Sequence, residues 1–126
     1  QETVILRGLT ESIRANPNGQ SSYPAAVKGY IGVGEKSPKK KCFNATCTPA
    51  EMADYDSYLA ADAASRIGIS ITMTDCPGVG STIKRQCLFA AWDETASKLK
   101  AGDYSACMSS TGTYVFTAKC LMMEAY

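Results

Sequence analysis

The sequence predicts an α+β domain in which helices pack on one face of an antiparallel sheet. Three observations support this class. Apolar side chains recur at helical spacing in residues 1–16, a helix-start signal stands at Thr48, and apolar residues alternate with polar ones after Arg66. The 126 residues are enough for one hydrophobic core but not for two. We therefore expect a single globular domain over residues 1–126.

Residues 1–16 are expected to form the first helix. Leu6, Leu9 and Ile13 fall at i, i+3 and i+7, which is one stripe of a helix, and Pro17 ends the helix because it restricts the residue before it. We expect this stripe to cover the sheet. No capping residue precedes the helix, so we interpret it as part of a longer helix whose beginning has been removed. The face expected to stay exposed contains Val4, Arg7, Glu11 and Arg14.

Residues 17–66 are expected to connect this helix to the sheet. The first part has turn chemistry, and segment 25–33 is expected to form a short strand or an extended loop, anchored by Tyr23 and Tyr30. The charged, proline-broken loop that follows is expected to be solvated, although its lysines could also contact phosphate or an anionic surface. These lysines are Lys36, Lys39, Lys40 and Lys41.

A second helix is predicted from Pro49 to about Ala64. Thr48 and Glu51 have the spacing of a capping box, in which each side chain bonds to the backbone amide of the other residue. Asp54 and Asp56 are expected on the solvated surface rather than as ligands of a cation. The stripe expected to face the core consists of Met52, Tyr55, Leu59 and Ala63.

Residues 67–126 are expected to form the antiparallel sheet. Apolar side chains from Ile67 to Met73 alternate with Gly68, Ser70 and Thr72, the pattern of a half-buried strand with one polar face. A turn over 76–81 and an exposed connection over 93–103, with a helical turn near 96–99, are expected between strands. The four expected strands cover residues 67–74, 82–92, 104–109 and 114–122.

The cysteine content indicates disulfide bonds. Six cysteines, an even number, in a small chain are typical of three disulfides formed in an oxidising compartment, and their spacing does not fit a zinc site. Cys42–Cys47 is the local pairing we favour. A regular hairpin would not place Cys107 opposite Cys120, so we expect at least one bond between non-adjacent segments. The six residues are Cys42, Cys47, Cys76, Cys87, Cys107 and Cys120.

Composition argues against several classes of function. The net charge of +1 provides no strong field for nucleic acid. The chain has no histidine, so the commonest general base and the common catalytic triads are missing. We expect no enzyme activity, no metal and no cofactor. No run of about 18 apolar residues is present, and neither is a signal peptide, which also suggests that an export segment has been removed.

Three stretches resemble PilV-like minor pilins of type IV pili. The most specific is Leu9-Thr10-Glu11-Ser12-Ile13-Arg14-Ala15-Asn16-Pro17, followed soon by Tyr23. The stretches Cys47-Thr48-Pro49-Ala50-Glu51-Met52-Ala53 with Asp56, and Cys87-Leu88-Phe89-Ala90-Ala91-Trp92-Asp93-Glu94, are similar to the same family. The resemblance touches three places within residues 2–94.

This resemblance implies a type IV pilin-like roll, with the soluble half of a long helix packed on a four-stranded sheet. It implies an apolar N-terminal half-helix that a prepilin peptidase processes, that is often methylated, and that anchors the subunit in the bacterial inner membrane before assembly. It implies a structural subunit that primes assembly at the pilus tip and supports adhesion and twitching motility. Its partners would be other minor pilins, the major pilin and a tip adhesin, contacted through Val4, Arg7, Glu11 and Arg14.

Three alternatives remain open at this point. A minor pseudopilin of a type II secretion system would share these features. A DNA-binding minor pilin for DNA uptake could use Lys36, Lys39, Lys40 and Lys41 together with Arg7 or Lys28 as a phosphate-binding patch. An unrelated secreted, disulfide-rich module would instead have a short, fully capped and buried first helix.

Overall fold

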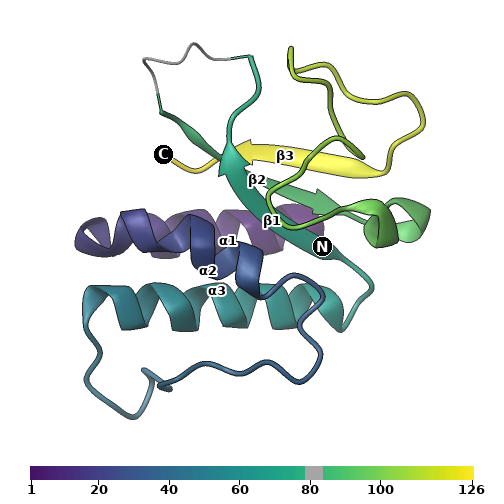
Figure 1. The fold of residues 1–126 in the computed structure, drawn as a ribbon. Coiled ribbons are helices and arrows are strands. Elements are labelled where there is room, and N and C mark those ends of the chain that lie inside the picture. The colour runs from purple at the N-terminus through teal and green to yellow at the C-terminus, as the bar shows by residue number, and fades with distance from the viewer. Residues whose placement is uncertain (79–83) are drawn as a thin grey trace.

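The protein folds as a three-stranded antiparallel sheet with its helices on one face (Figure 1). The computed structural model describes residues 1–78 and 84–126, with strand order β1-β2-β3. The elements are α1 (Glu2–Arg14), the 3₁₀ helix η1 (Pro17–Ser22), α2 (Tyr23–Gly29), α3 (Pro49–Ser65), β1 (Ser70–Asp75), β2 (Gln86–Ala91), the 3₁₀ helix η2 (Asp93–Lys98) and β3 (Cys120–Glu124). The α+β class is confirmed, but the described residues contain three strands rather than four.

The central strand β2 is buried on both faces. Leu88 and Ala90 point into a core shared with the helices, whereas Cys87, Phe89 and Ala91 point into a second core on the opposite face. Alternate residues of a strand point to opposite faces, so burial of the whole run requires a layer on each side. The helices form one layer, and the irregular chain between β2 and β3 contributes to the other.

Helix α1 directs its apolar stripe inward. Leu6 and Ile13 have no exposed surface, Leu9 is 2% exposed, and all three join Ile71 and Leu88 in the core on the helix side. Burial of each such side chain contributes about 1.5–3 kcal/mol, which outweighs the small propensity terms of an isolated helix. Packing against the sheet and α3 therefore stabilises α1.

Segment 25–33 is neither a strand nor an extended loop, because most of it belongs to helix α2. Tyr23, Val27 and Tyr30 recur at i, i+4 and i+7, and all three are buried. Pro24 occupies the first turn of α2, where a missing amide proton costs nothing. The predicted anchoring positions are both buried, with Tyr23 at the start of α2 and Tyr30 at its C-cap.

Helix α3 begins at the predicted capping box, with Thr48 and Glu51 bonded reciprocally. The predicted inner stripe was wrong, since Leu59 is 46% exposed and Ala63 is also exposed. Small side chains face inward instead, and they allow the backbones of α1 and α2 to approach α3 closely. The buried residues of α3 are Ala53, Ser57, Ala61 and Ala64.

The first strand begins later than predicted. Gly68 has φ +77°, a conformation that favours glycine, and it turns the chain after α3, so Ile67 is 50% exposed. The face predicted to be polar is also buried at Thr72, whose hydroxyl accepts a hydrogen bond from the Gly102 amide at 2.8 Å. The predicted turn over 76–81 lies partly outside the described residues, as does the predicted start of the second strand at 82.

The predicted third strand is absent from the described residues, and the last strand is shorter than predicted. Residues 104–109 and 114–119 form turns, with a single isolated bridge between Met108 and Tyr114. Tyr104, Cys107 and Met108 pack in the second core, which we call the outer core, whereas Tyr114 and Val115 are 48% and 42% exposed. Phe116, expected within the last strand, is 91% exposed. The connection over 93–98 forms η2, and its Thr95 is buried rather than exposed.

All six cysteines form disulfides, as predicted. The three bonds are Cys42–Cys47, Cys76–Cys87 and Cys107–Cys120. The first is the local pairing that the sequence favours. The expectation of a bond between non-adjacent segments was wrong, because each cysteine pairs with its neighbour in sequence. Cys107 reaches Cys120 since residues 100–119 fold back irregularly and not as a regular hairpin.

Candidate subunit-contact surface

Helix α1 presents two further faces beside its buried stripe. Val4, Arg7, Glu11 and Arg14 lie on the solvent side, and Val4 is 71% exposed. Ile5, Gly8 and Ser12 lie between this face and α3. Val4 is thus a single exposed aliphatic side chain on a face that is otherwise charged.

A groove of about 230 Å³ runs between α1 and α3. Its floor is formed by small residues on both helices, and no atom lies within 4 Å of the place where a Cβ on Gly8 would stand. Val4 and Leu59 project at its margins, 71% and 46% exposed. The remaining lining residues are Ile5, Leu9, Ser12, Asp56, Ala60 and Ala63. Its shape and apolar lining suit the side chains of a neighbouring helix.

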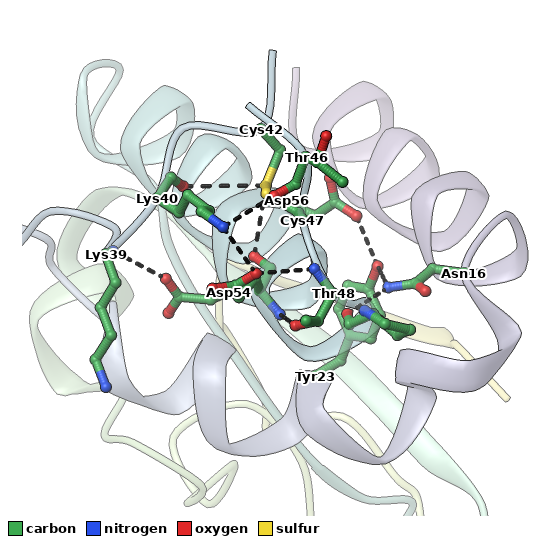
Figure 2. Close-up of a disulfide and its surroundings, with 12 residues drawn as sticks. Asn16, Tyr23, Lys39, Lys40, Cys42, Thr46, Cys47, Thr48, Asp54 and Asp56 are labelled. Atoms are coloured by element: carbon green, nitrogen blue, oxygen red, sulfur yellow. Dashed lines mark hydrogen bonds and ion pairs between the residues drawn. A yellow bond between two sulfur atoms is a disulfide. The ribbon is translucent and has the colours of Figure 1, made fainter. Parts of the chain in front are cut away.

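One wall of the groove contains a hydrogen-bonded network that links α1, α2 and α3. The Tyr23 hydroxyl donates to Asp56 Oδ2 at 2.6 Å, and Asn16 Nδ2 donates to the Tyr23 hydroxyl and to the Pro49 carbonyl (Figure 2). Burial raises the pKa of Asp56, whereas the hydrogen bond from Tyr23 lowers it. The network fixes the angle at which α3 meets the end of α1.

A second tyrosine–aspartate pair joins α2 to α3 one turn away. The Tyr30 hydroxyl donates to Asp54 Oδ1 at 2.9 Å. The expectation that Asp54 and Asp56 are merely solvated was therefore wrong, because each accepts a tyrosine hydroxyl. The seven-residue spacing of Tyr23 and Tyr30 is the sequence signal that could have indicated this, since it places both hydroxyls on one helix face.

We expect the protein to lose stability at alkaline pH. Burial, and next the hydrogen bonds to Asp56 and Asp54, raise the pKa of Tyr23 and Tyr30 above their ordinary value of 10.0. A group whose pKa is raised on folding stabilises the fold fully below its unfolded pKa, and the contribution is lost as pH rises through the folded pKa. The melting temperature should therefore hold up to about pH 9 and fall above about pH 10.

The double variant Tyr23→Phe/Tyr30→Phe tests this assignment. It should lose about 1–3 kcal/mol per hydroxyl at neutral pH, because Asp56 loses the Tyr23 donor and Asp54 keeps only the Lys39 amide, and its alkaline fall should be shallower. Tyr55→Phe is the matched control, since its hydroxyl makes no hydrogen bond to the described residues. Equal alkaline slopes for the double variant and the parent would show that other groups cause the transition.

The predicted lysine patch is partly neutralised within the domain. Lys40 Nζ donates to the Thr46 carbonyl at 2.9 Å and lies 3.4 Å from Glu51 Oε1, while the Lys39 amide contacts Asp54 Oδ2 (Figure 2). A shallow hollow of about 210 Å³ beside them is lined by both charge signs. Lys36 Nζ donates to the carbonyl of Ile31. Lys41 is exposed. This arrangement does not favour a phosphate-binding surface.

Within residues 1–78 and 84–126, no group of three or more Cys, Asp or Glu side chains has the arrangement of a metal site. No helix in the same residues combines the length and apolar character needed to cross a bilayer.

Comparison with known proteins found one similarity, in the N-terminal part of the chain. Residues 1–58 match the family model described as Tt1218-like, Type IV pilin Tt1218. The match supports a type IV pilin. The matched residues contain α1, η1, α2 and the first part of α3, including Tyr23, Tyr30, Asp54 and Asp56 and the α1 side of the groove. No curated protein and no solved structure matched the chain.

Proposed function

We propose that this protein is a PilV-like minor pilin of a type IV pilus. The observation that carries the proposal is the family match over residues 1–58, which coincides with the helix whose outer face and groove are open to a partner. The resemblance of Leu9–Pro17 to minor pilins supports the finer assignment. A role in the pilus at the cell surface also agrees with the three disulfides, which form in oxidising compartments.

The role is one of assembly rather than catalysis. An apolar segment preceding α1 anchors the subunit in the inner membrane and then joins the helical bundle at the filament centre. The exposed face of α1, with Val4, Arg7, Glu11 and Arg14, contacts neighbouring pilins. The disulfides restrain the globular part when the filament is pulled. We place the subunit at or near the tip, where it primes assembly and supports adhesion and twitching motility.

The groove between α1 and α3 would receive part of a neighbouring pilin. Gly8, Ser12, Ala60 and Ala63 let a helix approach closely, and Leu59 would be buried on contact. A carboxylate introduced at Leu59 would then be buried without a partner, which costs several kcal/mol in an interface. The isolated domain would tolerate the same change, because position 59 is 46% exposed there.

Leu59→Glu in the full-length gene should therefore abolish assembly without unfolding the domain. In a strain lacking the gene, we expect complementation with this variant to give at least about tenfold fewer surface pili by electron microscopy than the parent gene. Ile67→Glu is the matched control, since Ile67 is 50% exposed and lies outside the groove. Normal piliation with Leu59→Glu would place the subunit contact elsewhere.

Immunogold labelling of the assembled filaments tests the finer placement. Label confined to one end of each pilus is the expected result for a tip subunit. Label along the whole length would contradict the minor role at the tip while leaving the type IV pilin assignment intact. Unchanged piliation accompanied by loss of secreted proteins in a deletion strain would instead support a pseudopilin of type II secretion.

A further inference from the structure

Asp56 contributes the one charge among the described residues that line the groove between α1 and α3. The other lining residues are uncharged, and the Ser12 hydroxyl is already used, since it donates to the Gly8 carbonyl within α1. The ion pairs between described residues do not include Asp56. The groove therefore contains a negative charge that the described part of the domain does not compensate.

The two carboxylate oxygens of Asp56 have different surroundings. The Tyr23 hydroxyl donates to Oδ2 at 2.6 Å, and Asn16 holds this hydroxyl in turn (Figure 2). No described residue donates to Oδ1. Among the described side chains, only Ser57 Oγ is fully buried without a hydrogen-bond partner, so Oδ1 keeps contact with solvent. Asp56 therefore offers a partner one accessible acceptor oxygen, and Tyr23 fixes its position.

Covering the groove would remove water from this oxygen. Partial burial already raises the pKa of Asp56, which shows that the domain itself disfavours the charged form. A carboxylate that loses its remaining water without gaining a partner opposes association strongly. A segment that covers the groove must therefore bring a hydrogen-bond donor to Oδ1.

We propose that the groove binds a helix of another pilin that places a lysine or arginine on Asp56 Oδ1, an inference that rests on the function proposed above. Helices α1 and α3 run antiparallel, because Asn16 after α1 bonds to the Pro49 carbonyl at the start of α3. Ala63 lies seven residues after Asp56, about 10 Å along the groove, beside Val4. The bound helix therefore carries its basic residue about two turns from a small or apolar residue on the same face.

A cation suits this position better than a neutral donor. A hydroxyl or an amide would bond to Oδ1 but would leave a net charge buried in the contact. An ammonium or guanidinium group supplies both the hydrogen bond and the opposite charge. The groove also has room for its aliphatic stem, because no atom lies within 4 Å of the place where a Cβ on Gly8 would stand, and Ala60 lies opposite on α3.

Photo-cross-linking in piliated cells tests the proposal. The full-length protein would carry p-benzoylphenylalanine in place of Leu59, which lies at the groove margin three residues after Asp56. Irradiation should join it to a helix of another pilin, identified by mass spectrometry, with a lysine or arginine on the contacting face. A linked helix without such a residue, or an adduct between two copies of this chain, would overturn the proposal. Normal piliation without any pilin adduct would contradict the groove contact of the proposed function as well.

Asp56→Asn in the cross-linking protein isolates the charge. Asparagine keeps an oxygen for the Tyr23 hydroxyl but leaves the partner's cation unpaired, so the adduct yield should fall at least about tenfold. Asp54→Asn is the matched control, since Asp54 accepts from Tyr30 in the same way but lies outside the groove, and the yield should not change. An equal or higher yield for Asp56→Asn would show that the groove is covered without a cation. That result would overturn the proposal and leave the pilin contact intact.

Replacement of the other pilin's basic residue by glutamine keeps the test independent of folding in this chain. With Asp56 unchanged, it should lower the adduct yield as much as Asp56→Asn does. The two changes together should lower the yield no further than either change alone, because both remove the same ion pair. An unchanged yield after the glutamine replacement would overturn the proposal even if Asp56→Asn does not fold.

Discussion

Leu6→Asp is expected to prevent folding of the domain. Leu6 has no exposed surface and lies in the core between α1 and the sheet. Truncating such a side chain costs about 2–5 kcal/mol, and the introduced carboxylate adds the cost of an unpaired buried charge. A domain of this size has about 5–15 kcal/mol of stability in total, so the variant should be largely unfolded at 25 °C.

Circular dichroism and urea denaturation check this result. Val4→Asp is the matched control, because it makes the same chemical change two residues earlier in α1 at a position that is 71% exposed. It should alter the free energy of unfolding by no more than about 0.5 kcal/mol. Similar stability of Leu6→Asp and Val4→Asp would mean that α1 does not pack on the sheet through this stripe.

Removal of the Cys107–Cys120 bond is expected to cost about 3 kcal/mol or more. The bond closes a loop with a sequence separation of 13, for which restriction of the unfolded chain alone accounts for about 3 kcal/mol. Cys107 is fully buried in the outer core, so a serine there also buries a hydroxyl. Cys107→Ser/Cys120→Ser should therefore lower the melting temperature by more than about 10 °C.

The double variant Cys42→Ser/Cys47→Ser provides the comparison. Its loop has a sequence separation of only 5 and lies on the surface, so about 2 kcal/mol is expected. Differential scanning calorimetry of the two variants under identical conditions gives the ranking. A larger loss for the Cys42–Cys47 variant would show that the lysine loop, rather than the outer core, limits the stability of the domain.

Features that depend on residues within one or two helical turns were predictable. The capping box at Thr48 and Glu51 formed because both side chains act on amides three residues away. The stripe of Leu6, Leu9 and Ile13 is buried because α1 has a single apolar face. The α2 segment was missed although its period is helical, because a seven-residue helix contains too few turns for a convincing pattern.

The face of α3 could not be predicted from hydrophobicity alone. Its inward residues are alanine and serine, which carry little hydrophobic signal, while Leu59 is partly exposed at the groove. Packing against α1 and α2 selects the inward face of α3, because their larger side chains leave room only for small ones. The same packing brought Tyr23 to Asp56 and Tyr30 to Asp54, pairs separated by 33 and 24 residues.

In the sheet, residues 100–126 show the same limit of prediction from sequence. Alternating side chains from Tyr114 to Met122 suggested a strand, but strand formation requires a neighbour with free backbone groups. Within residues 100–119, Tyr104, Cys107 and Met108 pack in the second core instead, whereas residues 111–117 are exposed. The Cys107–Cys120 bond ties this segment to β3. A pattern with period two therefore indicated which residues could pair but not whether a partner strand was present.

By itself, the amino-acid sequence determined the local elements of this protein: the amphipathic α1, the capped start of α3, the core strands, and the presence of three disulfides. It also carried the similarity to a type IV pilin family model, because the matched residues 1–58 are contiguous in the sequence. The tertiary structure alone decided the groove between α1 and α3 and the tyrosine–aspartate pairs. Each of these features depends on contacts between residues that are distant in sequence. Such contacts form only when the chain has folded.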